Sequence, residues 1–195
     1  MKKFFIFIFA MFGLMVGFVA IVLSGYYRDY EKFHNRSSFP EPKENLLVPV
    51  STRAYAKAKS WSEKSPLSKQ QIKNYLTKYG RYSEYTSQSA VNKLNIDWRE
   101  QAVLAAKSLQ KYRYSKEKLV WQLINVELFT QEEADYAVEH VNFDWKEDAV
   151  KEAESSANGG NISKERLLEI LVENRKFTQE EAEYAIEHAQ VDWLN

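Results

Sequence analysis

Apolar residues in the second half of the chain recur with the period of an α-helix, and the segment that carries this pattern is repeated along the sequence. The stretch from Phe129 to Trp145 returns 48 residues later as Phe177 to Trp193, and a diverged copy, Tyr82 to Trp98, lies 47 residues earlier. A fixed period of this length is typical of tandem repeats. Within each copy the apolar spacing i, i+3, i+4, i+7 predicts a short amphipathic helix. The predicted inward positions are Ala134, Ala137, Val138 and Val141 in one copy and Ala182, Ala185, Ile186 and Ala189 in the next.

Two helices are predicted in each copy, and they begin at residues suited to capping. A serine, threonine or aspartate side chain accepts a hydrogen bond from the free amides at a helix start. The first helix is predicted to begin at Ser68, Ser115 and Ser163, and the second at Thr130 and Thr178. A glutamate follows each of these threonines three residues later, as in a capping box.

An Asp-Trp pair closes every copy, and the first two pairs open a third, alanine-rich helix that leads into the next copy. The pairs are Asp97-Trp98, Asp144-Trp145 and Asp192-Trp193. Asp97 and Asp144 are predicted caps, with Glu100 and Glu147 completing the boxes. The tryptophans are predicted to be structural and to fill the junctions between units, because large aromatic side chains dominate core burial. Alanine stripes let helices approach closely, so we expect an all-α fold of compact three-helix clusters.

The N-terminal residues follow a different pattern. Phe4 to Leu23 are twenty residues without a charge, and a helix of that length spans about 30 Å, the thickness of a bilayer's hydrocarbon core. The alternative is a cleaved secretory signal, whose apolar region is shorter, about 7–15 residues. We predict an uncleaved transmembrane anchor. Lys2 and Lys3 favour a cytoplasmic N-terminus, with the rest of the protein outside the cell.

Pro40, Pro42 and Pro49 lie in a stretch without helical or strand period, which predicts an extended tether. The predicted organisation is an anchor (1–25), an extracellular tether (26–52), a diverged basic repeat (53–98) and two acidic repeats (99–145 and 146–195), of which the last is a C-terminal cap.

Charge divides the chain although its formal net charge is zero. Residues 1–114 contain 19 basic and 8 acidic side chains, and the remainder contains 8 basic and 19 acidic ones. Two rows of carboxylates are predicted to face outward, away from the alanine stripe, and are candidates for binding a basic segment of a partner protein. An ordinary solvated surface, or attraction between the two halves of the chain, are the alternatives. The rows are Glu132, Asp135 and Glu139, and Glu180, Glu183 and Glu187.

Catalytic and cofactor chemistry find little support in the sequence. The chain has no cysteine, and it has no glycine-rich phosphate loop or nucleophile signature. His140 and His188 occupy equivalent places, but each copy lacks the second histidine of a metal-binding pair. No enzyme activity, metal or cofactor is therefore predicted. Nucleic-acid binding is not expected either, because the two similar copies are acidic where a DNA-reading helix would be basic.

Taken together, these motifs resemble the Ltp family of host cell surface-exposed lipoproteins, which phages and prophages of Gram-positive bacteria carry. The likeness rests on Ser-Lys-x-x-Leu, then Phe-Thr-x-Glu-x-Ala-x-Tyr-Ala, then Asp-Trp, and it covers about residues 54–195. The resemblance implies helix-turn-helix-like units that confer superinfection exclusion. In that family the protein stops a second phage from injecting its DNA, by binding the tape measure protein. One departure is that Tyr26 follows Leu23-Ser24-Gly25 where the family has a lipidated cysteine.

Our hypothesis is a prophage-encoded protein, anchored by its N-terminal helix to the membrane of a Gram-positive bacterium, whose repeats bind a basic segment of a phage tail or tape measure protein. Two alternatives remain open at this point. One is a structural or adhesive module that binds cell-wall polymer or another surface protein. The other is an envelope enzyme with a scattered catalytic set.

Overall fold

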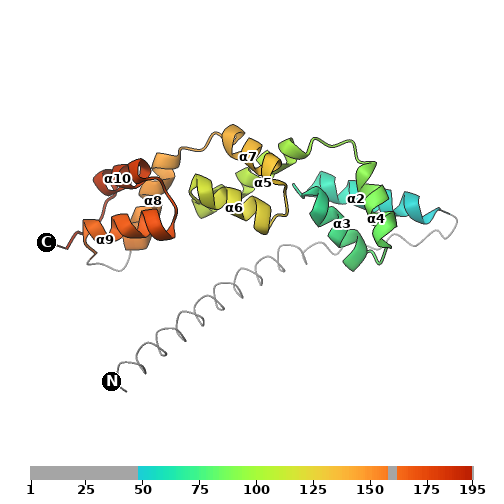
Figure 1. Cartoon of the computed structure of the whole chain (residues 1–195), viewed down its shortest axis with the longest axis horizontal. Coiled ribbons are helices and arrows are strands. Elements are labelled where there is room, and N and C mark those ends of the chain that lie inside the picture. The colour runs from blue at the N-terminus through green and yellow to red at the C-terminus, as the bar shows by residue number, and fades with distance from the viewer. Residues whose placement is uncertain (1–47, 158–161, 195) are drawn as a thin grey trace, which may run out of the picture. The chain divides into compact units, whose positions relative to one another are not determined.

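The computed structural model describes residues 48–157 and 162–194, and the described residues are helical throughout apart from their connections (Figure 1). The predicted all-α fold class is confirmed. Its elements are α2 (Val50–Lys64), α3 (Lys69–Lys78), α4 (Glu84–Asn92), α5 (Trp98–Leu109), the 3-10 helix η1 (Gln110–Tyr112), α6 (Lys116–Asn125), α7 (Gln131–His140), α8 (Trp145–Ala157), α9 (Lys164–Glu169), the π-helix η2 (Ile170–Asn174) and α10 (Gln179–His188).

The predicted membrane anchor, residues 1–25, lies outside the described residues, as does most of the predicted tether. Among the residues that the structure describes, no helix is long and apolar enough to cross a membrane. The tether was predicted to extend to residue 52, but α2 already begins at Val50. Pro49 explains the difference, because its carbonyl accepts from the amides of Thr52 and Arg53 while its missing N–H costs nothing at a helix start.

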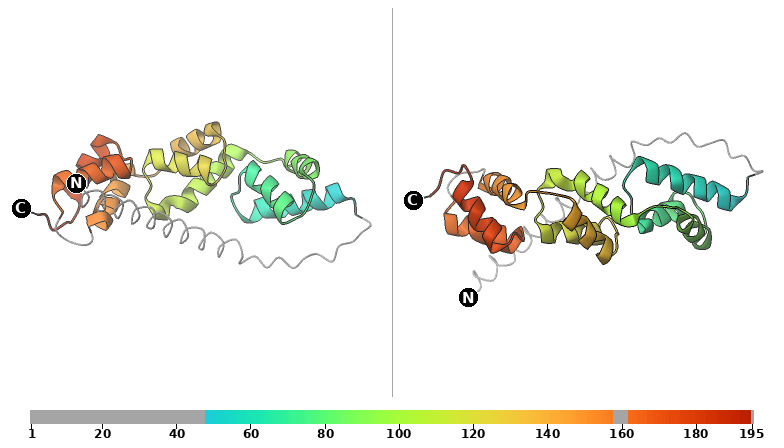
Figure 2. Two further views of the ribbon diagram at one scale, coloured as in Figure 1. Left: turned by 60° about the horizontal axis from the view of Figure 1, so that its bottom comes forward. Right: turned by 90° about the horizontal axis from the view of Figure 1, so that it is seen from above.

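Three hydrophobic cores lie along the described chain, and each is built by three consecutive helical segments (Figures 1 and 2). The first core joins α2, α3 and α4, the second joins α5, α6 and α7, and the third joins α8, α9 with η2, and α10. The alanine-rich helix is thus the first helix of a cluster and packs against the last one. Ala102 and Ala106 of α5 are fully buried in the same core as Ala134 and Ala137 of α7. Small side chains on both helices permit this close contact.

Helix starts are held by side-chain caps. Ser68 and Gln71 form a capping box, as do Thr130 with Glu133 and Thr178 with Glu181. Asp97 accepts from the amides of Arg99 and Glu100. The predicted return bond from Glu100 is not formed, because its carboxylate instead accepts from the hydroxyl of a tyrosine on α7.

Each tryptophan of the Asp-Trp pairs is half-buried against the cluster that precedes it. Trp98 and Trp145 open α5 and α8, yet they pack on the first and second cores, respectively. Trp193 packs on the third core, where the chain pairs with Ile162 in an isolated parallel bridge. The amide of Leu194 donates to the carbonyl of Ile162 at 3.2 Å, which attaches the final residues to the start of α9.

The turn between the last two helices of each cluster has the same backbone conformation in all three copies. One residue in this turn has a positive φ without being glycine: 55° at Arg81, 59° at Leu128 and 62° at Lys176. The next residue is aromatic, and its amide donates to a buried leucine carbonyl in the preceding helix. The three bonds are Tyr82 to Leu76 (3.1 Å), Phe129 to Leu123 (2.9 Å) and Phe177 to Leu171 (3.0 Å).

A side chain in this left-handed conformation costs about 1–2 kcal/mol, because its Cβ crowds the following carbonyl oxygen. We expect Lys176→Gly to raise the free energy of unfolding by about 1 kcal/mol, as measured by urea denaturation of the full chain. Lys107→Gly is the matched control, since this exposed lysine lies inside α5. That substitution should instead destabilise by about 1 kcal/mol, and equal losses at both positions would contradict the assigned turn.

Candidate functional site

The two carboxylate rows lie on α7 and α10, and all six side chains are exposed. Their surroundings differ from one residue to the next. Asp135 and Glu183 accept from the side-chain amides of Gln131 and Gln179 on the same helices, at 2.9 and 2.7 Å. Within the described residues, Glu132, Glu139 and Glu187 form no ion pair, so each of these three carboxylates is open to a partner.

Glu180 is the exception in this set, because Lys146 of α8 already pairs with it. The Nζ atom of Lys146 lies 2.7 Å from Glu180 Oε1. This hydrogen bond and the lysine charge lower the pKa of Glu180 and raise that of Lys146. The last row therefore offers less negative charge to a partner than the sequence predicts.

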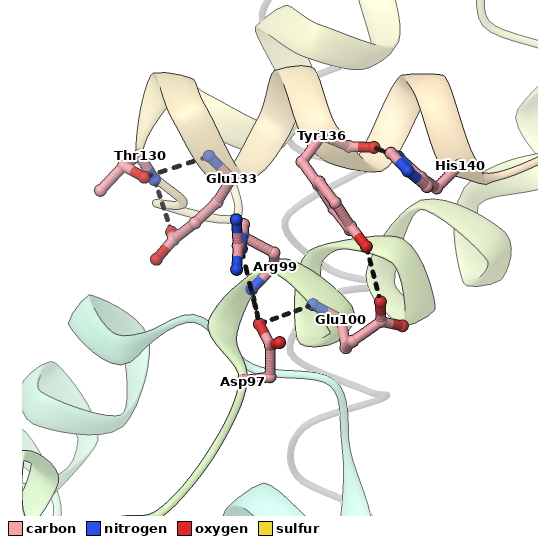
Figure 3. Close-up of polar contacts among 7 residues, drawn as sticks. All are labelled: Asp97, Arg99, Glu100, Thr130, Glu133, Tyr136 and His140. Atoms are coloured by element: carbon pink, nitrogen blue, oxygen red, sulfur yellow. Dashed lines mark hydrogen bonds and ion pairs between the residues drawn. The ribbon is translucent and has the colours of Figure 1, made fainter.

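Beside the first row, α7 carries an aromatic stack that the sequence reasoning missed. The rings of Tyr136 and His140 lie 3.8 Å apart at 15°. His140 Nδ1 lies 2.7 Å from the carbonyl oxygen of Tyr136, so this nitrogen donates to that carbonyl (Figure 3).

Side chains from the start of α5 complete this cluster on the other side of the tyrosine ring. The Tyr136 hydroxyl donates to Glu100 Oε1 at 3.0 Å, and the Arg99 guanidinium lies 5.2 Å from the ring centroid (Figure 3). The bond to Glu100 is the main cause that raises the pKa of Tyr136. Asp97 Oδ1 accepts from the Arg99 amide and lies 3.9 Å from its Nε. One cap thus positions both the arginine and the glutamate.

The last copy repeats this cluster with one change. Tyr184 and His188 stack at 3.9 Å, and His188 Nδ1 bonds the Tyr184 carbonyl at 2.8 Å. Lys146 replaces the arginine, 5.4 Å from the Tyr184 ring centroid. The recurrence of Tyr-x-x-x-His could have revealed the stack, since residues four apart share a helix face. The first copy has Ser89 and Lys93 at these places and lacks the cluster.

The tyrosine rings of both clusters face cations of the same chain. Arg99 and Lys146 occupy the tyrosine faces as cations, so the aromatic rings are already engaged within the chain. Among the residues that the structure describes, no three His, Asp or Glu side chains gather where they could hold a metal ion. What the surface offers outward is negative charge in a row along one helix, the form that attracts a basic segment.

Comparison with known proteins gives the family. The family model for host cell surface-exposed lipoproteins, Ltp, matches residues 97–141 and 144–189. The solved structure of Ltp, a superinfection exclusion protein from the Streptococcus thermophilus temperate phage TP-J34, is 32% identical over 95% of that chain and 47% of this one, with a TM-score of 0.44. The chain belongs to the Ltp family. No protein with a curated description matches it.

The two Ltp segments coincide with the second and third clusters. Each starts at or beside an Asp-Trp pair and ends with the acidic helix, so one family unit is an alanine-rich helix followed by the helix-turn-helix pair. The first cluster, which the sequence resemblance included, lies outside the matched segments. It keeps the three-helix core but lacks both the acidic row and the aromatic stack.

Neighbouring clusters contact each other through corresponding segments, although the bonded residues do not correspond. The start of one cluster's second helix meets the turn of the next cluster: Gln71 Nε2 donates to Glu127 Oε2 at 2.9 Å, and Ser115 Oγ donates to the Arg175 carbonyl at 2.8 Å. Arg175 also pairs with the mostly buried Glu152, at 2.7 Å. At each junction a carboxylate that is largely removed from solvent, Glu127 or Glu152, therefore has a polar side chain as its partner.

Glu127 makes the first junction sensitive to pH. Burial raises the pKa of its carboxyl above the ordinary 4.5, against the lowering effect of hydrogen bonds from Gln71 and Gln122. The folded state therefore holds this proton more tightly than the unfolded state, so the free energy of unfolding falls as pH rises from the ordinary pKa through the raised one. Glu127→Gln should flatten that slope and stabilise the protein at neutral pH, as urea denaturation across pH will measure. Glu132→Gln, which removes an exposed carboxylate, is the control variant.

The Tyr136 hydroxyl allows a second matched comparison. Tyr136→Phe removes the bond to Glu100 and leaves that carboxylate without its donor, so the thermal unfolding midpoint should fall. Tyr184→Phe removes the equivalent hydroxyl, which makes no such bond to Glu147, and should change the midpoint less. Equal effects at the two positions would show that the Tyr136–Glu100 bond contributes nothing.

Proposed function

We propose that this chain is a superinfection exclusion protein that acts on the outer face of the membrane of its host bacterium. The observation that carries the proposal is the 32% identity over 95% of a solved superinfection exclusion protein. The two tandem segments that match the family model also support it, because each keeps the caps, the core and the turn of the three-helix unit.

The step that it blocks, on this proposal, is injection of phage DNA. The outward carboxylates of α7 and α10 capture a basic segment of the incoming phage's tape measure protein. Supporting this assignment, Glu132, Glu139 and Glu187 are exposed and, within the described residues, form no ion pair. Complementary charge of this kind accelerates encounter and selects partners. Of the two rows, that of α7 carries more unneutralised charge, because Lys146 pairs with Glu180.

Attachment to the membrane is also part of the proposal. The apolar residues Phe4 to Leu23 are long enough to span a bilayer as a helix. Because the chain has no cysteine, thioether-linked lipid cannot provide the attachment. The apolar span replaces the lipid and keeps the repeats at the surface where a tail component emerges.

An envelope module that binds anionic wall polymer is the second candidate, and the charge of the first cluster together with the start of the second favours it. Residues 51–114 contain 13 basic and 4 acidic side chains. The two candidates use opposite ends of the chain and opposite charge. Pull-down with purified cell wall at low and high salt therefore separates them.

Charge reversal tests the exclusion proposal. Cells that express Glu132→Lys with Glu139→Lys should lose most protection, with phage DNA entering as fast as in control cells while adsorption is unchanged. Binding of a lysine-rich tape measure segment to the purified full chain should weaken at least tenfold, an electrostatic effect that salt also reduces. Glu173→Lys, an exposed reversal outside the rows, is the control. If cells that express the wild-type protein admit the DNA of every phage in a panel as fast as control cells do, exclusion is not the function.

A further inference from the structure

The turn between α3 and α4 is built differently from the turns of the other two clusters. In the second and third clusters this turn contacts the preceding cluster through Glu127 and Arg175, but among the described residues no cluster precedes the first one. Gly80 takes the corresponding place. A Cβ added at Gly80 would lie 2.7 Å from the ring of Tyr82, so this turn has no room for a side chain like that of Glu127. It therefore lacks the group that joins the second cluster to the first.

Aromatic and basic side chains occupy the exposed places on this turn. Tyr79 is 63% exposed and Tyr85 is 85% exposed. In the sequence, Tyr85 takes the place of the first carboxylate in each acidic row. Lys78 and Arg81 are exposed beside the rings, and the Nζ atom of Lys78 lies 5.2 Å from the ring centroid of Tyr79. We call these four residues the turn patch.

The positive charge of the turn patch is not neutralised within the described part of the chain. Glu84 is the acidic neighbour in sequence, and it pairs with Lys73 of α3 at 2.5 Å. Within the described residues, Lys78 and Arg81 form no ion pair, so both cations are open to a partner. The whole first repeat, residues 53–98, contains 9 basic and 3 acidic side chains. A partner of this patch is therefore expected to be anionic and to accept tyrosine rings.

We propose that the turn patch docks on the anionic lipid surface of the membrane to which the chain is attached, an inference that rests on the membrane attachment proposed above. Tyrosine rings settle at the level of the lipid headgroups, and basic side chains beside them attract anionic headgroups. Residues 24–49 separate the apolar span from α2, and 26 residues reach at most about 90 Å. This connection keeps the first cluster close to the bilayer, where a high effective concentration makes a weak contact sufficient.

Docking of this turn gives the repeats an orientation. The second and third repeats, residues 99–195, contain 12 basic and 20 acidic side chains, so the same anionic surface repels them. The first cluster then lies on the membrane, and the acidic rows of α7 and α10 stand away from it. This arrangement leaves both rows open to a phage component that approaches the membrane.

The test places a fluorescent label beside the turn and a quencher on the lipid headgroups. Because the chain has no cysteine, Gln88→Cys gives a single labelling site one turn of α4 after Tyr85. The labelled full chain is reconstituted in vesicles of phosphatidylcholine with or without anionic phosphatidylglycerol. We expect the docking equilibrium constant to be at least about fivefold larger in the anionic vesicles, and salt to reduce it. A label at Gln190→Cys, in the third cluster, should be quenched little in either vesicle.

Charge reversal separates the turn patch from the general charge of the chain. Lys78→Glu with Arg81→Glu should lower the docking constant at least about tenfold, because both cations then repel the headgroups. Lys59→Glu with Lys107→Glu is the matched control, since it changes the net charge equally at exposed sites outside the turn. This control should keep most of the docking. Circular dichroism should show the same helix content in both double variants.

Equal quenching in the two kinds of vesicle, or full quenching in the charge-reversed turn, would overturn the proposal. Quenching that appears only at many copies per vesicle would also overturn it, because a second copy would then occupy the turn. The same holds for quenching that purified cell-wall polymer abolishes, since the wall would then be the partner. Flotation of the full chain with vesicles at high salt tests the apolar span by itself, and phage DNA entry tests exclusion. A turn that does not dock is therefore distinguishable from a failure of the proposed function.

Discussion

The hydrogen bond from an aromatic residue's amide to a buried leucine carbonyl fixes each cluster of this protein. It closes a turn that is too tight for ordinary backbone angles, so the residue before the aromatic adopts a positive φ. The bond places Phe129 and Phe177 in their cores and puts a threonine cap directly after each ring. The direction of α7 and α10, and therefore which carboxylates point outward, depends on this turn.

The same turn connects neighbouring clusters. Glu127 and Arg175 precede the positive-φ residue by one position in their turns, and each contacts the previous cluster. The two junctions use different atoms, a side-chain carboxylate in one and a backbone carbonyl in the other. The donor also differs, since a glutamine amide donates at the first junction and a serine hydroxyl at the second. Sequence can therefore diverge at the junctions while the order of the clusters is kept.

Features that depend on neighbours in sequence could be predicted, whereas those that depend on packing could not. Caps such as Thr130 with Glu133 follow from local hydrogen bonding, and the alanine stripes follow from helical period. That α5 packs against α7, the last helix of its cluster, could not be predicted, since the sequence pattern does not say which helices contact each other. The positive φ of Leu128 also could not be predicted, because glycine is the residue that normally signals such a turn. Glu100 was predicted to complete a capping box, but it instead accepts a hydrogen bond from Tyr136, 36 positions away in the sequence.

The two carboxylate rows differ in ways that depend on their three-dimensional surroundings and not on the sequence pattern. Sequence treats the rows on α7 and α10 as equal, but their neighbours on α5 and α8 make them different. Arg99 lies over the Tyr136 ring and close to Asp97, so the charges of the α7 row remain available. Lys146 lies over the Tyr184 ring and also pairs with Glu180. An arginine disperses its charge over a planar group that stacks on rings, whereas a lysine acts as a point charge that seeks a carboxylate. One substitution between repeats therefore concentrates the free negative charge on the second cluster.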